Sequence, residues 1–320
     1  MESMKAVRIH DFGGADMLRE ESLPVPQPGD DELLVKVCAA SINPVDYKIR
    51  KGGYIGPEQL PVTMGRDISG VIESRGANIR DFARGDAVYA MLGRDRGGYA
   101  EYVILKPGEY AAKPAKLDHV RAAAVPLAAL TAWQGIFDHG GLAAGQRVLI
   151  HGGAGGVGHM AIQFAKAKGA WVATTVSKSD LGFARDLGAD RVIDHRNEDF
   201  SEQLHDLDLV YDLIGGEVQK KSVKVLKHSG ALITTVGPAE GLGKEKHIRA
   251  THYMAQPNGN QLGEIAKLID EGKVHVVVDA VFLLADAARA QEMLEKEHIR
   301  GKIVLEVSAD GAGGLRSAAE

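Results

Sequence analysis

The chain has 320 residues, 45% of them hydrophobic and 25% charged, and it contains one cysteine. This composition is typical of a globular protein and excludes a disordered chain. The lone Cys38 excludes an intrachain disulfide and any zinc site built on two thiolates of one chain. With 38 basic and 43 acidic residues, the net charge of −5 does not favour nucleic acid or a membrane as partner. No apolar run reaches bilayer length and no signal-peptide core is present, so the sequence predicts a cytoplasmic protein.

The length exceeds that of one ordinary domain and predicts two. Over about the first 115 residues, alternating or β-branched runs separated by turn residues predict a β-rich region. These strands are expected at residues 5–10, 33–40, 68–73, 86–91 and 99–105. A short helix is expected at residues 44–50, because Pro44 suits a first helical turn and Gly52 and Gly53 end it.

After Asp118 the pattern changes to an Ala-rich apolar helical stretch, residues 120–138, interrupted by Pro126. Strands are then expected at residues 147–151, 171–175, 191–194, 209–214 and 231–236. Helices alternate with them at residues 156–168, 178–187, 198–204, 217–227 and 261–271. Such alternation predicts a parallel, doubly wound sheet with helices on both faces. A helix at residues 285–297 and a strand at 301–307 follow, and this last strand could return to the N-terminal β region.

The most specific motif follows the strand that ends at His151. In the pattern G-x-G-x-x-G, Gly153 permits the turn, Gly155 lets backbone approach a pyrophosphate, and Gly158 lets the helix pack on the strand. The motif follows a strand, opens an amphipathic helix and begins a βαβ series, which favours a dinucleotide site over a purely structural turn. We therefore assign the turn to the cofactor: Gly153, Ala154, Gly155, Gly156, Val157 and Gly158.

The residues after the second strand of this region indicate which dinucleotide is bound. An NAD site usually places an acidic residue about 20 residues after the glycine turn, but none occurs from Gly153 through Ser179. Ser177 and Lys178 stand there instead, and a hydroxyl and an ammonium suit a 2′-phosphate. The sequence therefore predicts NADP(H), although Ser177 could also cap the next helix. His195 could add to the phosphate site or lie at the surface.

Several blocks, taken in order, resemble the medium-chain dehydrogenase/reductase superfamily, and specifically its zinc-independent, zeta-crystallin-like quinone oxidoreductase and enone reductase branch. They are residues 4–6, 41–48, 65–72, 85–89, 98–102, 126–132, 153–158 and 300–304. The resemblance covers nearly the whole chain and implies an α/β protein of two domains. A discontinuous GroES-like β-barrel domain, residues 1–123 and 268–320, would hold the substrate, and an inserted Rossmann domain, residues 124–267, would bind the dinucleotide.

Zinc-dependent alcohol dehydrogenases of the same superfamily bind catalytic zinc through a Cys, a His and a second Cys. The resemblance places those ligands at Asn43, Arg66 and Leu127. A guanidinium cannot ligate zinc and a leucine has no donor atom. The four-cysteine structural zinc lobe is missing too, so we expect no metal site.

Without a metal ion, polarising an alcohol or a simple carbonyl is difficult, whereas a quinone or an activated C=C bond needs only a well-placed hydride donor. We therefore expect a zinc-independent NADPH-dependent oxidoreductase that acts on a quinone or on an α,β-unsaturated carbonyl. Two alternatives stay open: an NADPH-binding sensor or structural protein without turnover, and a zinc-free alcohol or sugar dehydrogenase.

Similar enzymes hold the nicotinamide between their domains, and the resemblance places Asn43, Tyr47 and Thr131 near that ring. Asn43 could donate to the acceptor oxygen, or it could cap the helix that begins at Pro44. Tyr47 is the best proton donor in reach, with packing as its alternative. Thr131 is assigned to the cofactor, together with Ile214, Val236, Gly237 and Lys302.

Arg66 departs from the aromatic residue expected in this branch, so it could favour an anionic or strongly polar acceptor, or pair with Asp67 or Asp46. Tyr54, Tyr253 and Met254 lie in two loops expected to border the substrate, and core packing is an equal alternative for each. Related proteins often dimerise through an edge of the Rossmann sheet, so we expect a homodimer.

Overall fold

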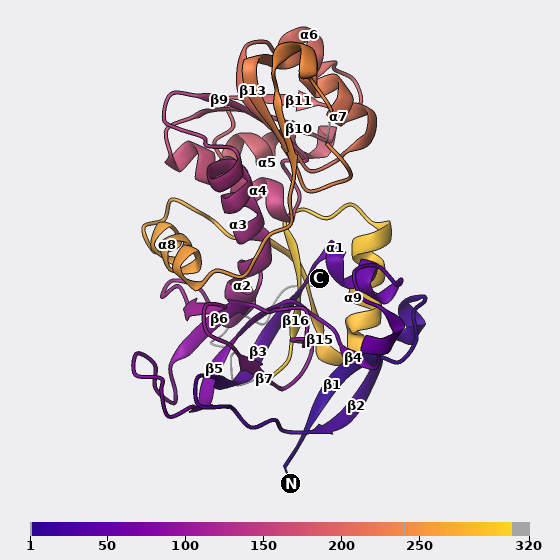
Figure 1. Cartoon of the computed structure of the whole chain (residues 1–320), viewed down its shortest axis with the longest axis vertical. Coiled ribbons are helices and arrows are strands. Elements are labelled where there is room, and N and C mark those ends of the chain that lie inside the picture. Colours follow the sequence, from indigo (N-terminus) through magenta and orange to yellow (C-terminus); the bar gives the residue numbers. More distant parts are fainter. Residues whose placement is uncertain (1, 240, 309–320) are drawn as a thin grey trace, which may run out of the picture. The chain divides into compact units, whose positions relative to one another are not determined.

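The computed structural model describes residues 2–239 and 241–308, which form two compact units (Figure 1). Unit 1 contains the chain up to Leu127, Pro257–Glu271, and the chain from Val276 onward, and unit 2 contains Ala128–Gln256 and Gly272–His275. The sequence-based division assigned residues up to 267 to the nucleotide-binding domain. Helix α8 (Gly259–Asp270) lies in unit 1 instead, because Gly259 N–H donates to the Gly108 carbonyl and the Tyr89 hydroxyl donates to the Leu262 carbonyl.

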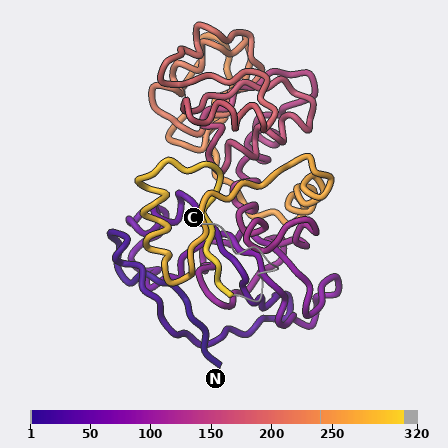
Figure 2. Tube along the Cα trace, turned by 180° about the vertical axis from the view of Figure 1, so that it is seen from behind, coloured from indigo at the N-terminus to yellow at the C-terminus, as the bar shows by residue number. Residues whose placement is uncertain are grey.

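Unit 1 is built on two sheets, one with the strand order β15-β16-β3-β5-β6-β8, to which β7 adds beside β3, and one with the order β2-β1-β4. The last described strand pairs antiparallel with β3, so segments from the N-terminal and C-terminal parts of the chain share a sheet in this unit as expected (Figure 2). The strands are β1 (Ser3–Ile9), β2 (Arg19–Pro24), β3 (Leu33–Ile42), β4 (Val62–Thr63), β5 (Asp67–Arg75), β6 (Ala87–Met91), β7 (Tyr102–Leu105), β8 (Tyr110–Ala112), β15 (Val278–Leu283) and β16 (Lys302–Glu306).

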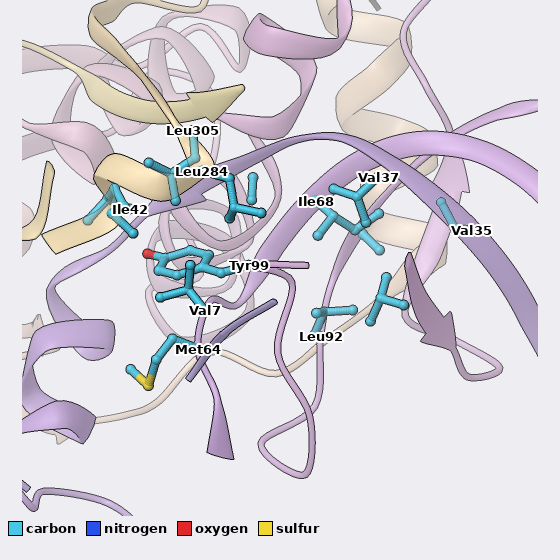
Figure 3. Close-up of a cluster of buried hydrophobic side chains, with 14 of the residues drawn as sticks. Val7, Val35, Val37, Ile42, Met64, Ile68, Leu92, Tyr99, Leu284 and Leu305 are labelled. Carbon is cyan, nitrogen blue, oxygen red and sulfur yellow. The ribbon is translucent and has the colours of Figure 1, made fainter. Parts of the chain in front are cut away.

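The core of unit 1 explains why its strands carry nearly continuous apolar runs. β3 is buried along nearly its whole length, as expected of a strand covered on both faces. Figure 3 shows the Tyr99 ring packed among Val7, Ile42 and Met64. The helices of unit 1 are α1 (Pro44–Arg50), α2 (His119–Ala123), α8 and α9 (Ala287–Lys296), with 3₁₀ turns at Ala15–Met17, Pro57–Gln59 and Leu284–Asp286.

Unit 2 is a parallel six-stranded sheet with the order β11-β10-β9-β12-β13-β14, as the β/α alternation predicts. Because β9 has β10 on one side and β12 on the other, the strand order reverses at β9, which is where α/β sheets bind ligands. The strands are β9 (Arg147–His151), β10 (Trp171–Val176), β11 (Arg191–Asp194), β12 (Leu207–Asp212), β13 (Leu226–Thr234) and β14 (Arg249–His252). The helices are α3 (Pro126–Trp133), which crosses the unit boundary, α4 (Gly156–Ala167), α5 (Leu181–Asp186), α6 (Phe200–Gln203) and α7 (Gly216–Ser222), with a π-helical turn at Gln134–His139 and 3₁₀ turns at Lys178–Asp180, Val223–Val225 and Lys244–Lys246.

Several predicted boundaries were wrong for identifiable reasons. β12 ends at Asp212, because this carboxylate accepts the N–H groups of Ile214 and Gly215 and turns the chain. β13 already begins at Leu226, where Leu226 pairs with Leu207, so the predicted helix 217–227 is too long. The short edge strands β14 and β15 were missed.

One further strand begins later than expected, since residues 99–101 bond to β1 and Met64 before β7 starts at Tyr102. In the described part of the chain, no helix is both long and apolar enough to cross a membrane.

Candidate active site

The glycine turn of unit 2 closes tightly between β9 and α4. Gly152 takes a left-handed φ of 74°, and the N–H groups of Gly152 and Gly153 donate to the Thr175 carbonyl at 3.1 and 3.2 Å. Gly155 is the N-cap of α4, so the amides that open this helix have no carbonyl of the preceding turn to bond. These amides, at the positive end of a 12-residue helix, form an anion site of the kind that holds a pyrophosphate.

The three motif glycines are needed for different reasons. A Cβ on Gly153 would lie 2.1 Å from the Thr174 hydroxyl oxygen, and one on Gly158 would lie 2.1 Å from the Gly152 carbonyl oxygen. A Cβ on Gly155 would meet only the Gly152 oxygen at an ordinary 3.6 Å, and Gly155 has a φ of −75° that any residue adopts. Neither packing nor backbone therefore requires glycine at position 155. The cradle over Gly155 fits a group that must approach the backbone closely, which is what a dinucleotide diphosphate does.

Polar groups suited to a 2′-phosphate gather at the ends of β10 and β11. The Ser177 hydroxyl lies 3.4 Å from His195 Nε2, and Lys178 is exposed beside Ser177. Asp194, at the end of β11, turns its oxygens to the Arg196 N–H and the Asn197 amide. The structure thus brings together the three residues that the sequence assigns to the 2′-phosphate.

Three further predicted cofactor residues lie in the loops after β12 and β13. Ile214 is 53% exposed, and its Cδ1 would lie 3.2 Å from a Cβ on Gly152, so this loop borders the glycine turn. Val236 lies beside Gly215, whose Cβ would meet the Val236 Cγ1 at 2.9 Å, and Gly237 follows with a φ of 69°. Ile214, Val236 and Gly237 therefore lie at the carboxyl end of the sheet, on the edge that carries the turn.

The predicted residues Thr131 and Tyr253 come together inside unit 2. The Thr131 carbonyl accepts hydrogen bonds from the hydroxyls of both Tyr211 and Tyr253, and these hydroxyls lie 2.7 Å apart. Tyr253 is 6% exposed, and burial raises its pKa. Its ring also packs against His139, with centroids 4.5 Å apart. This is the packing role that the sequence left open for Tyr253, whereas Met254 next to it is partly exposed.

In unit 1, the predicted residues Asn43 and Lys302 meet in a buried polar network around Asp67. Asn43 Nδ2 donates to Asp67 Oδ2 at 2.8 Å, and Lys302 Nζ donates to Asn43 Oδ1 and to the Ile42 carbonyl. The Lys302 ammonium lies 3.9 Å from Asp67, which also accepts from the Ser41 hydroxyl and the Leu127 N–H. One Nδ2 hydrogen of Asn43 is left for another acceptor, and the residue is only 1% exposed.

A second buried carboxyl completes the network. Asp46 accepts the Asn43 N–H at 2.7 Å and the Tyr99 hydroxyl at 3.0 Å, while its Oδ1 has no partner in the described chain. Burial raises the pKa of Asp46 to about 7. Burial also raises the pKa of Asp67 and lowers that of Lys302, each partly offset by the other's charge. Asn43 is thus the N-cap residue of α1, with its side chain turned into the network.

Arg66 is also buried, at 6% exposure, but its hydrogen-bond acceptor is a neutral carbonyl. Its Nε and Nη2 both donate to the Leu92 carbonyl, at 2.9 and 2.6 Å. Within the described residues it forms no ion pair with Asp67 or Asp46, so the pairing that the sequence left open is not formed.

Tyr47 and Tyr54 are the more accessible aromatic side chains of this region. Tyr47 is half-buried, with the Lys51 ammonium 5.3 Å from its ring centroid, and burial raises the pKa of its hydroxyl. Tyr54 is 46% exposed at an unusual φ of 72°, with the Arg94 guanidinium 5.7 Å from its ring centroid. Both tyrosines present surface that a ligand could reach.

Two family models match the chain, one described as an alcohol dehydrogenase GroES-like domain over residues 29–115 and one as a zinc-binding dehydrogenase over residues 187–305. The mitochondrial NAD(P)H oxidoreductase RTN4IP1 of Danio rerio is 36% identical, over 96% of this chain and 92% of that protein. The chain belongs to the medium-chain dehydrogenase/reductase superfamily.

Other members of the superfamily are equally similar. The chloroplastic NADPH-dependent alkenal/one oxidoreductase of Arabidopsis thaliana is 36% identical, over 95% of this chain and 80% of that protein. The structure of the quinone oxidoreductase from Coxiella burnetii superimposes with a TM-score of 0.89 at 37% identity, covering 96% of this chain and 100% of that one. The mixed architecture of a GroES-like domain and a parallel-sheet domain is thereby confirmed.

The zinc in one family description does not fit the residues of this medium-chain dehydrogenase/reductase. At the three expected ligand positions, Asn43 is bonded to Asp67 and Lys302, Arg66 is a cation, and Leu127 has no side-chain donor. Among the described residues, no three His, Cys, Asp or Glu side chains gather as metal ligands would.

Sequence reasoning missed Asp46, Asp67 and Tyr99 as parts of the network, and it assigned Lys302 to the cofactor. Asp67, Tyr99 and Lys302 meet partners 24 to 260 residues away, beyond any local motif, whereas the bond from Asn43 N–H to Asp46 lies within the first turn of α1. One signal was available: Asp67 opens strand β5, whose first four residues are buried, and a buried acid requires a partner.

Proposed function

We propose that this protein is an NADPH-dependent oxidoreductase that reduces a quinone, or the C=C bond of an α,β-unsaturated carbonyl, without a metal ion. The observation that carries the proposal is the set of side chains at the three zinc-ligand positions, none of which can hold zinc, combined with a fitted dinucleotide cradle at Gly155. Such acceptors are electrophilic enough to take a hydride without a Lewis acid. The names of the similar proteins, alkenal/one oxidoreductase and quinone oxidoreductase, support the same class of acceptor.

When bound, NADPH would supply the hydride. The backbone N–H groups of the turn from Gly153 to Gly158 would hold its diphosphate, which the amides that open α4 favour electrostatically. Ser177, Lys178 and His195 would hold the 2′-phosphate, and this contact selects NADPH over NADH. Ile214, Val236 and Gly237 border the turn and would exclude water from one side of the dinucleotide.

On the acceptor side, we propose Asn43 and Tyr47 as the residues that act on the substrate. Asn43 has one Nδ2 hydrogen left to donate to an oxygen that gains negative charge. The buried network would fix the orientation of that amide, because Lys302 holds Oδ1 and Asp67 holds the other Nδ2 hydrogen. Tyr47 keeps its proton at neutral pH, because burial raises its pKa, and this is required of a proton donor.

The role of Tyr47 can be tested by replacing it with phenylalanine. If its hydroxyl protonates the reduced substrate, Tyr47→Phe lowers kcat by about 10²–10⁴-fold at pH 7. Tyr110→Phe, another half-buried tyrosine of unit 1, is the matched control and should leave kcat unchanged. A change of only a few-fold in Tyr47→Phe assigns this ring to packing.

The function itself is tested by following NADPH oxidation with 1,4-benzoquinones, alkyl vinyl ketones and enals, with and without EDTA. We expect turnover with at least one of these classes, no effect of EDTA, and a clear preference for NADPH over NADH. Tight NADPH binding with no turnover on the whole panel would favour an NADPH sensor or structural protein. Turnover restricted to alcohols or sugars would favour a zinc-free dehydrogenase.

Two further proposals come from the sequence and concern the whole protein. We propose a homodimer formed through the edge strand β14 of unit 2, to be checked by light scattering on the purified chain. We also propose a cytoplasmic location, to be checked by fractionating cells that express the full chain.

A further inference from the structure

Arg66 carries a buried charge that no acid neutralises by contact. It is 6% exposed, and its only hydrogen bonds within the described chain run from Nε and Nη2 to the Leu92 carbonyl. Nη1 has no hydrogen-bond partner there, and no carboxylate oxygen lies within 4 Å of the guanidinium. Burying an arginine on a neutral acceptor alone is costly. The position of Arg66 therefore suits the binding of a negatively charged group that does not belong to unit 1.

The acids around Arg66 form their hydrogen bonds with other groups. Glu109 bonds to Arg96 and accepts two backbone N–H groups. Asp67 accepts from a serine hydroxyl, an asparagine amide and a backbone N–H, with Lys302 as its nearest cation. Asp46 accepts a backbone N–H and a tyrosine hydroxyl through Oδ2, and its Oδ1 has no hydrogen-bond partner among the described residues, Arg66 included. None of these acids turns an oxygen to Arg66.

A second cation and an aromatic ring lie near Arg66 in unit 1. Burial lowers the pKa of Arg66, the charges of Asp46 and Asp67 raise it, and Arg94 lowers it as a like charge. Its guanidinium lies 5.7 Å from the ring centroid of Tyr54, which is 46% exposed. Tyr54 also holds a left-handed φ of 72°, a conformation that costs a non-glycine residue free energy and is often kept at ligand sites.

We propose that Arg66, Arg94 and Tyr54 form a subsite for a carboxylate-bearing conjugated acceptor. This rests on the proposed function and narrows its substrate class from any quinone or enone to one with an acidic substituent. The free Nη1 of Arg66 donates to the carboxylate, Arg94 adds a second positive charge at the surface, and the Tyr54 ring covers the conjugated system. The buried position of Arg66 keeps this contact strong, because little water screens it.

The test compares two acceptors that differ by one charge: a 1,4-naphthoquinone with a carboxylate on its second ring, and its methyl ester. We expect the wild-type protein to prefer the acid in kcat/KM. Arg66→Gln should lower kcat/KM for the acid by roughly 10- to 100-fold and for the ester by less than 3-fold. Arg84→Gln, an exposed arginine of the same unit paired with Glu73, is the control and should change neither.

Calorimetry of the acid binding to each protein, without NADPH, gives a readout that does not depend on turnover. If no quinone, vinyl ketone or enal is reduced but Arg66→Gln still weakens binding of the acid, the proposed function fails and the subsite stands. If Arg66→Gln lowers kcat/KM for the acid and for the ester equally, Arg66 serves the reaction or the fold rather than recognition of the substrate's charge, and the proposal is overturned. Absence of any preference for the acid in the wild type also overturns it. Should Arg66→Gln fail to fold, Arg94→Gln replaces it. We expect Arg94→Gln to lower kcat/KM for the acid by roughly 3- to 10-fold and to leave kcat/KM for the ester unchanged.

Discussion

The two units bury polar groups in opposite ways. Unit 1 buries two carboxyls, Asp46 and Asp67, with the ammonium of Lys302, and so relies on full charges away from water. Unit 2 holds its buried groups with neutral donors. His151 bonds to the Thr175 and Ser222 hydroxyls at 2.9 Å, and Asp212 accepts two backbone N–H groups and the Thr234 hydroxyl.

This difference follows from what each region has to hold. Unit 2 presents backbone amides and glycines to a ligand that brings its own negative charge, so neutral surroundings suffice. Unit 1 orients one asparagine amide and the start of α1 from segments that are distant along the chain. These charged groups lie close together in the folded protein, so we expect the removal of one to leave its partner buried and unpaired.

The largest expected effect comes from removing the cation of unit 1. Lys302→Met leaves Asp67 without its nearest counter-charge and should cost about 3–5 kcal/mol of unfolding free energy at pH 8, measured by urea titration. The cost should shrink as the pH falls, because burial raises the pKa of Asp67 and the carboxyl can take up a proton. Lys267→Met, an exposed lysine paired with Glu264, is the control and should stay within about 0.5 kcal/mol. A loss below 1 kcal/mol for Lys302→Met would contradict the role given to this charge.

The two units should also respond to pH with opposite sign. The pKa of Asp46 is raised to about 7 in the folded protein, so its stabilising contribution is complete below about pH 4 and is lost as the pH rises to about 7. Burial lowers the pKa of His151 to about 4, so its contribution is complete above about pH 6.5 and is lost as the pH falls to about 4. Each change is worth on the order of 3–4 kcal/mol across its window.

Two substitutions separate these contributions. Relative to the wild type, Asp46→Asn should gain stability steadily from pH 4 to pH 7, while His151→Gln should gain as the pH falls over the same range. The measurement is the difference in unfolding free energy between variant and wild type, followed as a function of pH. Its slope is compared, because either substitution can also change stability by an amount that does not depend on pH. Parallel slopes for the two variants would refute the contrast. The groups that act on Asp46 are Asp67, Tyr99, Lys302 and Arg66, and Asp212 acts on His151.

The same contrast separates what the sequence predicts from what it does not. The glycine turn and the helix at Pro44–Arg50 were found because each depends on neighbours along the chain, and the residues predicted to bind the 2′-phosphate lie at the ends of consecutive strands. The spacing of the three motif glycines, Gly153, Gly155 and Gly158, can be read directly from the sequence. The parallel sheet of unit 2 followed from strict β/α alternation, whereas its strand order comes from the structure.

The network of unit 1 could not be found in this way. Asn43 was read as a cap or a substrate contact because Pro44 follows it, and nothing local shows that Lys302 reaches its amide. Asp67 stands beside Arg66 in the sequence and suggested an ion pair, but the two side chains have different partners. Arg66 lies in the bend before β5 begins at Asp67, and adjacency along the chain did not bring the two side chains into contact.

In unit 2, the two later motif glycines allow ligand contact to be separated from packing. Gly155→Ala adds a methyl group that meets only one ordinary contact, so the free protein should keep its unfolding free energy within about 0.5 kcal/mol. NADPH binding should weaken by roughly 10- to 100-fold, because that methyl occupies the diphosphate position. Gly158→Ala would press on the backbone of Gly152 and Gly153 and should destabilise the free protein. Equal destabilisation by both changes would show that Gly155 is a packing residue too.

The smallest effect is expected at Lys178, and it tests the choice of cofactor. Lys178 is exposed, so water and salt screen its charge, and Lys178→Ala should weaken NADPH binding by only about 10-fold at low salt and less at 0.5 M. NADH, which lacks the 2′-phosphate, should bind the variant as it binds the wild type. Lys220→Ala, a more exposed lysine of unit 2 paired with Glu217, is the control and should change neither affinity. If Lys178→Ala weakened NADH and NADPH equally, the ammonium would act on the shared part of the dinucleotide, and the preference for NADPH would have to come from Ser177 and His195.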